Sequence, residues 1–276
     1  DVVAAAGRVG FPCVIKATSL SASRGVIRAD DPAQAAAAGE RVRAILAEAS
    51  GSPDGALVVE RYVDGTEVAV EALLLQGQLE VLAIFDKPDP LTGPYFEETL
   101  YVTPSRLPAA TQADVREAAA AAAAAIGLVE GPAHAELRID AEGKPWLLEV
   151  AARSIGGLCS RSLRFGAGLS LEELILRHAL GLPLDPVREH AASGVMMLPI
   201  PAAGTLVEVR GQAEARAVPG IEGLELSVPP GRPVRPLPEA DRYLGFLFAR
   251  AATPEAVETA LRTAHARLEV VIDTAS

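Results

Sequence analysis

Alternation of apolar and polar residues along the chain predicts a series of short β-strands. We expect strands at residues 13–17, 26–28, 57–59, 67–73, 79–85, 134–139 and 146–150. The first two of these flank a loop of small residues, which predicts a hairpin. Because residues 57–59 are all branched and apolar, we expect that strand to be buried.

Helices are predicted between these strands from the spacing of apolar positions and from capping residues. They are expected at residues 1–8, 32–50, 112–126, 171–180 and from 254 onward. Four of them follow a residue whose side chain commonly accepts hydrogen bonds from the first turn of a helix, namely Asp31, Thr111, Ser170 and Thr253.

The mixture of helices and strands indicates an α+β fold, and changes in composition suggest three parts. Residues 86–108 are rich in proline and glycine and are expected to form an irregular surface loop. From Gly194 onward the strands become short and prolines frequent. We therefore predict parts at residues 1–64, 65–192 and 193–276, the last a small α+β domain.

Composition excludes several classes of protein. The chain is 50% hydrophobic and 22% charged, which is typical of a globular domain and not of a disordered chain. Its formal net charge of −11 argues against a nucleic-acid partner, because phosphate neutralisation needs a basic surface. No apolar run is long enough to span a membrane.

Two cysteines, Cys13 and Cys159, are too few for a disulfide framework and lack the spacing of metal ligands. We expect both to be reduced and the protein to be cytoplasmic. The chain opens on Asp1, inside an expected helix and without an initiating methionine. We therefore expect it to be a fragment.

Two glutamates on neighbouring strands form the most informative pair in the sequence. A tight turn at Glu142-Gly143 would place Glu136 directly opposite Glu149. Two carboxylates about 5 Å apart repel each other unless one is protonated or a cation lies between them. A hard divalent ion, most simply Mg²⁺, satisfies this pair. The alternatives are a shifted register or neutralisation by Arg138 and Arg153.

Lys16 lies at the end of a strand, just before the loop Ser21–Gly25. A lysine at this place can reach the phosphates of a nucleotide while backbone N–H groups of the loop close over them. The alternative is an ordinary solvated charge at a sheet edge.

The segment from Glu60 to Glu67 turns at Asp64-Gly65 and leaves backbone groups free beside an apolar wall. A flat heterocycle would fit such a slot, with Glu67 accepting hydrogen bonds from sugar hydroxyls. The alternative is an ordinary connection between strands with surface carboxylates.

Arginines follow the second carboxylate-bearing strand. Arg153 is placed to bind an anionic substrate or transition state. For Arg161 and Arg164 we favour simple ion pairing with Glu172 or Glu173. Glu97 and Glu98, in the proline-flanked loop, are candidate ligands for a substrate ammonium group, and the alternative is that both are simply solvated.

Together these segments resemble the ATP-grasp superfamily of ligases, in which two α+β lobes grip MgATP in a cleft. The resemblance covers roughly residues 8–182 and rests on four motifs in the same order along the chain. They are Phe11-Pro12-Cys13-Val14-Ile15-Lys16, Ser21-Ala22-Ser23-Arg24-Gly25-Val26, Val59-Glu60-Arg61-Tyr62-Val63-Asp64-Gly65-Thr66-Glu67, and Glu136 with Leu148-Glu149-Val150-Ala151-Ala152-Arg153.

The resemblance implies a role for each of these residues toward ATP and Mg²⁺, with Mn²⁺ as an alternative metal. Lys16 would contact the α- and β-phosphates. The lid over the γ-phosphate would include Ser21, Ser23 and Gly25. Adenine would be held by Glu60 and the backbone of Val63, and the ribose by Glu67. Glu136 and Glu149 would hold the metal ions. Ala151 replaces the asparagine that the family usually has two residues after the second glutamate.

Within that superfamily the chain most resembles the L-amino-acid ligase, or dipeptide synthetase, branch. The segments that carry this resemblance are residues 149–157, residues 93–98 with Pro104-Ser105, and the C-terminal part through Tyr243-Leu244-Gly245-Phe246. By this similarity Arg153 would stabilise the acyl-phosphate oxygens, and Gly156 would add a backbone donor. Glu98 would recognise a substrate amino group, and Tyr101 stands where some members carry histidine.

The implied activity is ATP-dependent ligation of a carboxylate to an amine through an acyl-phosphate. The implied partners are small-molecule substrates and a second copy of the chain in a homodimer. Two alternatives stay open. One is another ATP-grasp enzyme, either biotin-carboxylase-like or a phosphoribosylamine–glycine ligase. The other is a nucleotide-binding module without catalysis, which Ala151 and the lack of the family's N-terminal domain keep in play.

Overall fold

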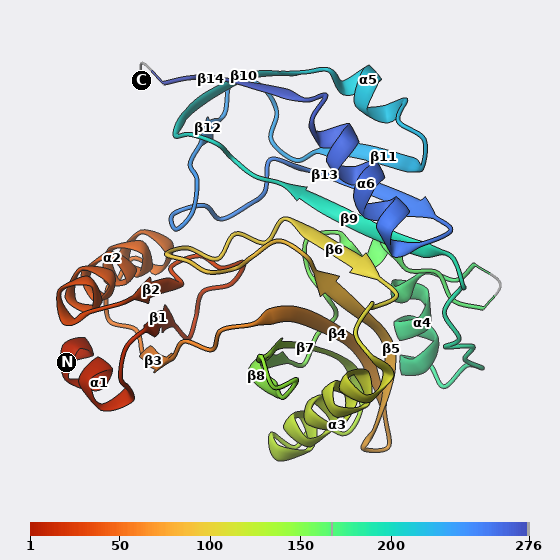
Figure 1. Ribbon diagram of the computed structural model, residues 1–276, viewed down its shortest axis with the longest axis horizontal. Coiled ribbons are helices and arrows are strands. Elements are labelled where there is room, and N and C mark those ends of the chain that lie inside the picture. Colours follow the sequence, from red (N-terminus) through yellow and green to blue (C-terminus); the bar gives the residue numbers. More distant parts are fainter. Residues whose placement is uncertain (167, 275–276) are drawn as a thin grey trace.

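The computed structural model describes residues 1–166 and 168–274, which form three antiparallel sheets with helices packed against them (Figure 1). One sheet has eight strands and the other two have three strands each. This is the mixed helix-and-strand architecture expected from the sequence.

Residues 1–61 contain a three-stranded sheet with the strand order β2-β1-β3, and this part of the chain is called the small lobe below. Its elements are α1 (Val2–Val9), β1 (Cys13–Ala17), β2 (Ile27–Ala29), α2 (Pro32–Ser50) and β3 (Leu57–Arg61). Strands β1 and β2 pair as the expected hairpin. Helix α2 begins where predicted, because the Asp31 carboxylate accepts a hydrogen bond from the Gln34 N–H.

The expectation that residues 57–59 are buried is wrong. Strand β3 lies at the edge of the small sheet, and the Val58 side chain is 36% exposed. Leu57 and Val59 pack against the buried cluster of the small lobe, whereas Val58 points to the other face. The side chains of this edge strand alternate between the two faces of the sheet, but this could not be seen from the sequence because all three residues are apolar.

The eight-stranded sheet has the order β11-β13-β9-β6-β5-β4-β7-β8. Its strands are β4 (Thr66–Leu75), β5 (Gln78–Lys87), β6 (Leu100–Thr103), β7 (Gly131–Ile139), β8 (Pro145–Ala151), β9 (Ala192–Leu198), β11 (Ile221–Leu226) and β13 (Gly245–Ala251).

Strand β4 is buried on both faces, and its alternation decides which side chains reach the functional site. Val68 and Val70 pack in the same cluster as residues of helix α3 (Ala109–Ala125). Ala69 and Leu73 pack on the opposite face, with residues of the 3₁₀ helix η1 (Cys159–Ser162) and of α4 (Leu171–Ala179). Period-two alternation therefore places Glu67 and Glu71 on that opposite face as well.

The C-terminal part shares the large sheet. Strand β9 lies between β6 and β13, and α6 (Pro254–His265) covers this region, as Figure 1 shows. The remaining elements are β10 (Gly204–Arg210), α5 (Gln212–Arg216), β12 (Pro233–Val234) and β14 (Glu269–Asp273). The division of the chain at residues 64 and 192 stays a prediction.

The segment 86–108, expected to be an irregular surface loop, contains a buried strand. All four residues of β6 are buried, and β6 pairs with β5 at one residue and with β9 at four. Its partner β9 is far along the chain, so neighbouring residues gave no sign of the pairing. A second correction concerns α3, which begins at Ala109 after Pro108, so Thr111 lies inside the helix and does not cap it.

The small lobe is tied to the C-terminal part through residues 235–239. The Gly25 N–H donates to the Pro238 carbonyl at 3.0 Å, and Arg41 Nε lies 2.7 Å from Glu239 Oε1. Arg235 forms a two-pronged ion pair with Glu48. The loop Ser21–Gly25 is therefore attached to the C-terminal part at Gly25. Within the described residues, no helix is both long enough and apolar enough to cross a membrane.

Candidate active site

A cavity of about 730 Å³ lies between the small lobe and the large sheet. Its wall includes residues of β1, the loop 18–26, β4, β7, β8 and the loop 153–157, with Met197 and Tyr243 from the C-terminal part. Cavities of roughly 300–1,000 Å³ are typical of small-molecule and cofactor sites.

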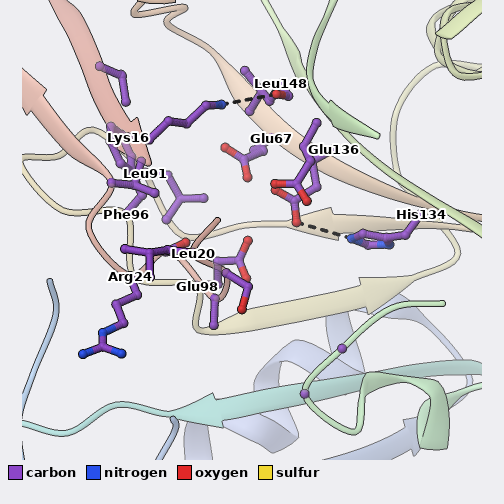
Figure 2. A pocket seen from close by; sticks show the side chains of 18 of the residues that line it. Lys16, Leu20, Arg24, Glu67, Leu91, Phe96, Glu98, His134, Glu136 and Leu148 are labelled. Carbon is purple, nitrogen blue, oxygen red and sulfur yellow. Dashed lines mark hydrogen bonds and ion pairs between the residues drawn. The ribbon is translucent and has the colours of Figure 1, made fainter. Parts of the chain in front are cut away.

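Three buried or nearly buried carboxylates meet on the floor of this cavity. They belong to Glu67 on β4, Glu98 before β6 and Glu136 on β7, and oxygens of all three lie within 4.8 Å of one another. Lys87, the last residue of β5, lies among them, with Nζ 2.7 Å from Glu67, 2.6 Å from Glu98 and 3.3 Å from Glu136. Figure 2 shows the three carboxylates converging.

Mutual attraction keeps Lys87 and Glu136 charged in spite of their burial. Burial lowers the pKa of Lys87, but Glu136 and Glu98 outweigh it and hold that pKa well above its ordinary value. Burial raises the pKa of Glu136, but Lys87 and His134 outweigh it and hold that pKa below its ordinary value. For Glu98 the effect of burial prevails over that of Lys87, and its pKa is raised.

Arg138 on β7 contacts Glu67 of the floor from the side of the small lobe. Its Nε lies 2.9 Å from Glu67 Oε2, so both oxygens of Glu67 are engaged. The same guanidinium donates to the carbonyl oxygens of Val63 at 2.7 Å and Leu91 at 2.6 Å. One buried arginine thus fixes the β3–β4 connection and the start of the loop that leads to Glu98.

His134, two residues before Glu136 on β7, lies between two carboxylates. Its Nδ1 is 3.2 Å from Glu71 Oε2 and its Nε2 is 3.3 Å from Glu136 Oε1 (Figure 2). Burial lowers the pKa of a histidine, but here Glu136 and Glu71 prevail and raise the pKa of His134 to about 9. The imidazole is therefore a cation at neutral pH, and with Lys87 it neutralises Glu136.

The backbone register of the expected metal pair is as predicted. Glu136 lies opposite Glu149, and a β-bulge leaves Leu148 as the extra residue of β8. The two side chains differ in their surroundings: Glu149 is 55% exposed and 3.7 Å from Arg153, whereas Glu136 is 21% exposed and faces Lys87 and His134. The alternative of neutralisation by Arg138 does not apply, because Arg138 pairs with Glu67.

The residues expected at a nucleotide line one cavity, most of them on the side of the small lobe and Glu67 on the floor. Lys16 lies 2.7 Å from Glu60 and also donates to the Leu148 carbonyl at 3.4 Å (Figure 2). Val63 and Glu67 line the same cavity. Lys16 thus bridges the small lobe and the bulge in β8.

Of the residues expected to form the lid, two line the cavity and one lies where the small lobe contacts the C-terminal part. Ser21 and Ser23 line the cavity together with Arg24. Gly25 instead packs on Leu20 and donates to Pro238, and its φ of +67° is one that glycine adopts without strain.

The residues expected at the acyl and amine substrates also line the cavity. Glu98 and the buried Tyr101 lie beside Lys87, whose Nζ is 4.9 Å from the centre of the Tyr101 ring. Arg153 and Gly156 lie in the loop after β8, and the Arg153 side chain is 50% exposed.

The ion-pair partners expected for Arg161 and Arg164 are wrong. Arg161 pairs with Glu225 of the C-terminal part, and Arg164 donates to backbone carbonyls. Glu173 pairs with Arg177 on its own helix. The partner of Arg161 lies on a strand remote in sequence, which local spacing does not reveal.

Sequence analysis missed Lys87 and Tyr243, which both contribute to the floor. Lys87 was assigned to a surface loop, although alternation with Ala83 and Phe85 on β5 is a signal that points it inward. Tyr243 lies with its hydroxyl 3.4 Å from Glu98 Oε2, and no local pattern links these residues.

The family model of the ATP-grasp domain matches residues 9–162. The chain belongs to the ATP-grasp family. A second family model, described as L-amino acid ligase C-terminal domain 2, matches residues 196–273. These matches confirm the resemblance and the fold predicted from the sequence motifs.

The proteins that the chain resembles include a carnosine synthase and two ligases. The chain is 34% identical to carnosine synthase 1 of Gallus gallus over 207 residues, 70% of this chain and 22% of that protein. It is 28% identical to alanine–anticapsin ligase of Bacillus subtilis over 64% of this chain and 40% of that protein. The crystal structure of an L-amino acid ligase from Bacillus licheniformis superposes with a TM-score of 0.82 at 28% identity, covering 96% of this chain and 65% of that one. The chain therefore spans less than two thirds of each of these relatives.

Proposed function

We propose that this chain forms the ATP-grasp part of a ligase that joins a carboxylate to an amine through an acyl-phosphate, with amino acids or similar molecules as substrates. The observation that carries the proposal is one cavity lined by Lys16, Glu136, Arg153 and Glu98 in a chain with both ATP-grasp and L-amino acid ligase family matches.

The nucleotide end of the cavity is the side of the small lobe. Lys16 would contact the α- and β-phosphates, and Ser21 and Ser23 would close over the γ-phosphate. Glu60 and the Val63 backbone would hold adenine. Glu67 would accept from the ribose hydroxyls, since a carboxylate has lone pairs beyond those that Lys87 and Arg138 use.

The metal end is the carboxylate floor. Its oxygen donors suit Mg²⁺, because a hard cation prefers carboxylate ligands. Glu136 and Glu149 would hold Mg²⁺, and Mn²⁺ would substitute. The metal would neutralise charge on the phosphates during transfer.

The remaining residues act on the second half of the reaction. A substrate carboxylate oxygen attacks the γ-phosphorus and ADP leaves. The amine nitrogen then attacks the acyl carbon, the C–O bond to phosphate breaks, and phosphate departs with the electron pair and takes up the proton that the nitrogen loses. Arg153 and the Gly156 N–H would stabilise the oxygens, and Glu98 beside Tyr101 would bind the amino group.

The test is ADP release by the full gene product with MgATP across single amino acids and amino-acid pairs. ADP that appears only with particular pairs supports the proposal and names the substrates. ADP with bicarbonate plus biotin, or with phosphoribosylamine plus glycine, would place the activity in another ATP-grasp branch. MgATP binding without ADP release under all conditions would indicate a non-catalytic module. A cytoplasmic location and a homodimeric assembly stay predictions.

A further inference from the structure

Glu71 is a carboxylate with no exposed surface, in the middle of β4. It lies behind His134, which lines the cavity, and its Oε1 has no hydrogen-bond partner within the described residues. Removing a carboxylate from water costs several kcal/mol, and an apolar side chain of the same size would avoid this cost. The raised pKa of Glu71, which burial causes against the opposing effect of His134, has the same origin. Glu71 therefore carries a burial cost that a side chain needed only for packing would not have.

The two groups that donate to Glu71 come from two different parts of the candidate site. His134 Nδ1 lies 3.2 Å from Oε2, and the other nitrogen of that ring faces Glu136. The Ile155 N–H donates to the same Oε2 at 3.0 Å. Ile155 lies between Arg153 and Gly156, so a single oxygen atom joins β7 to the loop after β8.

We propose that Glu71 is a positioning residue that fixes the loop carrying Arg153 and Gly156 relative to the carboxylate of Glu136. This inference rests on the proposed function, in which Glu136 binds the metal and the loop contacts the transferred phosphoryl group. A displacement of about 1 Å between such groups can lower a rate about 100-fold. Among the described residues, the half-exposed Arg153 side chain pairs with Glu149 at 3.7 Å and donates to the Ser154 carbonyl, so backbone support of its loop matters.

The test compares Glu71→Met with Glu71→Gln. Methionine fills the space without accepting from Ile155 or His134, whereas glutamine keeps one acceptor oxygen. The matched control is Glu80→Met, which removes an exposed carboxylate from β5 in the same hairpin. Two quantities are measured: amide hydrogen exchange of residues 152–158, and kcat with the KM for ATP.

In Glu71→Met we expect exchange in the loop to accelerate about tenfold, because its hydrogen-bond acceptor is gone. We expect kcat to fall about 100-fold with the KM for ATP changed less than about twofold. Glu71→Gln should recover most of both losses, and Glu80→Met should match the unmodified protein.

Unchanged exchange in Glu71→Met overturns the proposal, and so does faster exchange with unchanged kcat. A lower Tm with a parallel loss of MgADP binding would show a purely structural role and also overturns it. If Glu71→Met does not fold, Glu71→Asp replaces it, since aspartate keeps the charge but is one methylene shorter; normal exchange and kcat there overturn the proposal. Absence of ADP release by the unmodified protein would contradict the proposed function, and the exchange comparison would still decide whether Glu71 holds the loop.

Discussion

The floor of the cavity and its rim hold their charges in different ways. On the floor, Lys87 and Glu67 are 3% and 7% exposed, and each has more than one charged partner. On the rim, Arg153 and Glu149 are 50% and 55% exposed and 3.7 Å apart. The positions of the floor side chains are therefore fixed when the chain folds, because their charges are paired with one another. The rim side chains are weakly held and available to rearrange around a substrate.

The largest effect should come from removing the central cation of the floor. Lys87→Met leaves Glu67, Glu98 and Glu136 together without their shared ammonium group, and we expect the free energy of unfolding to fall by about 3–5 kcal/mol. Denaturant unfolding measures this, with Lys144→Met at an exposed turn as the control. Equal stability of the two variants would show that the floor is not held together by its charges.

A rim residue should affect catalysis and leave stability unchanged. Arg153→Ala should lower kcat by about 10²–10³, the usual cost of losing one stabilising group in the transition state, with ATP affinity nearly intact. Arg161→Ala, another half-exposed arginine but paired outside the cavity, is the control. Full activity of Arg153→Ala would refute the role of Arg153.

The two predicted metal ligands lie in different regions, Glu149 on the rim and Glu136 on the floor, so a substitution of Glu149 tests the rim alone. Glu149→Gln should weaken Mn²⁺ or Mg²⁺ binding in the presence of ADP by at least about tenfold, without lowering stability, because Glu149 lies on the rim. Isothermal titration gives the affinity, and Glu142→Gln in the adjacent turn is the control. An unchanged affinity would remove Glu149 from the metal site.

The smallest effect concerns the lid. Gly25→Ala should cost about 1 kcal/mol of stability, because Gly25 has φ +67° and its new Cβ would lie 3.1 Å from Leu20. Gly77→Ala has a similar φ of +81° with nothing within 4 Å, so it should show the backbone cost alone. Only Gly25→Ala should raise the KM for ATP, and an equal KM in both variants would mean that Gly25 does not shape the lid.

Sequence reasoning succeeded where partners are close along the chain. The Glu136–Glu149 pairing follows from a short hairpin, and Asp31 caps its helix through a residue three positions away. The same reasoning failed where partners are distant. Strand β6 is four residues long and is defined by its pairing with β9, which the sequence around it does not indicate.

The candidate site shows the same division. Lys16, Glu60 and Glu136 belong to local motifs and line the cavity as expected. Lys87 and Glu71 were missed because their partners are remote in sequence. Lys87 pairs with Glu98 before β6 and with Glu136 on β7. Glu71 contacts His134 on β7 and accepts from the Ile155 N–H in the loop after β8. Alternation along a strand indicates a face, but it does not reveal which charges meet on that face.

The place of β9 in the large sheet has a consequence for biosynthesis. As the chain leaves the ribosome, β4, β5 and β6 can associate early, yet the outer side of β6 has no partner until Ala192–Leu198 has been made, and β9 in turn waits for Gly245–Ala251. A nascent chain thus exposes an unpaired strand edge late into translation, the kind of surface that recruits other chains and chaperones.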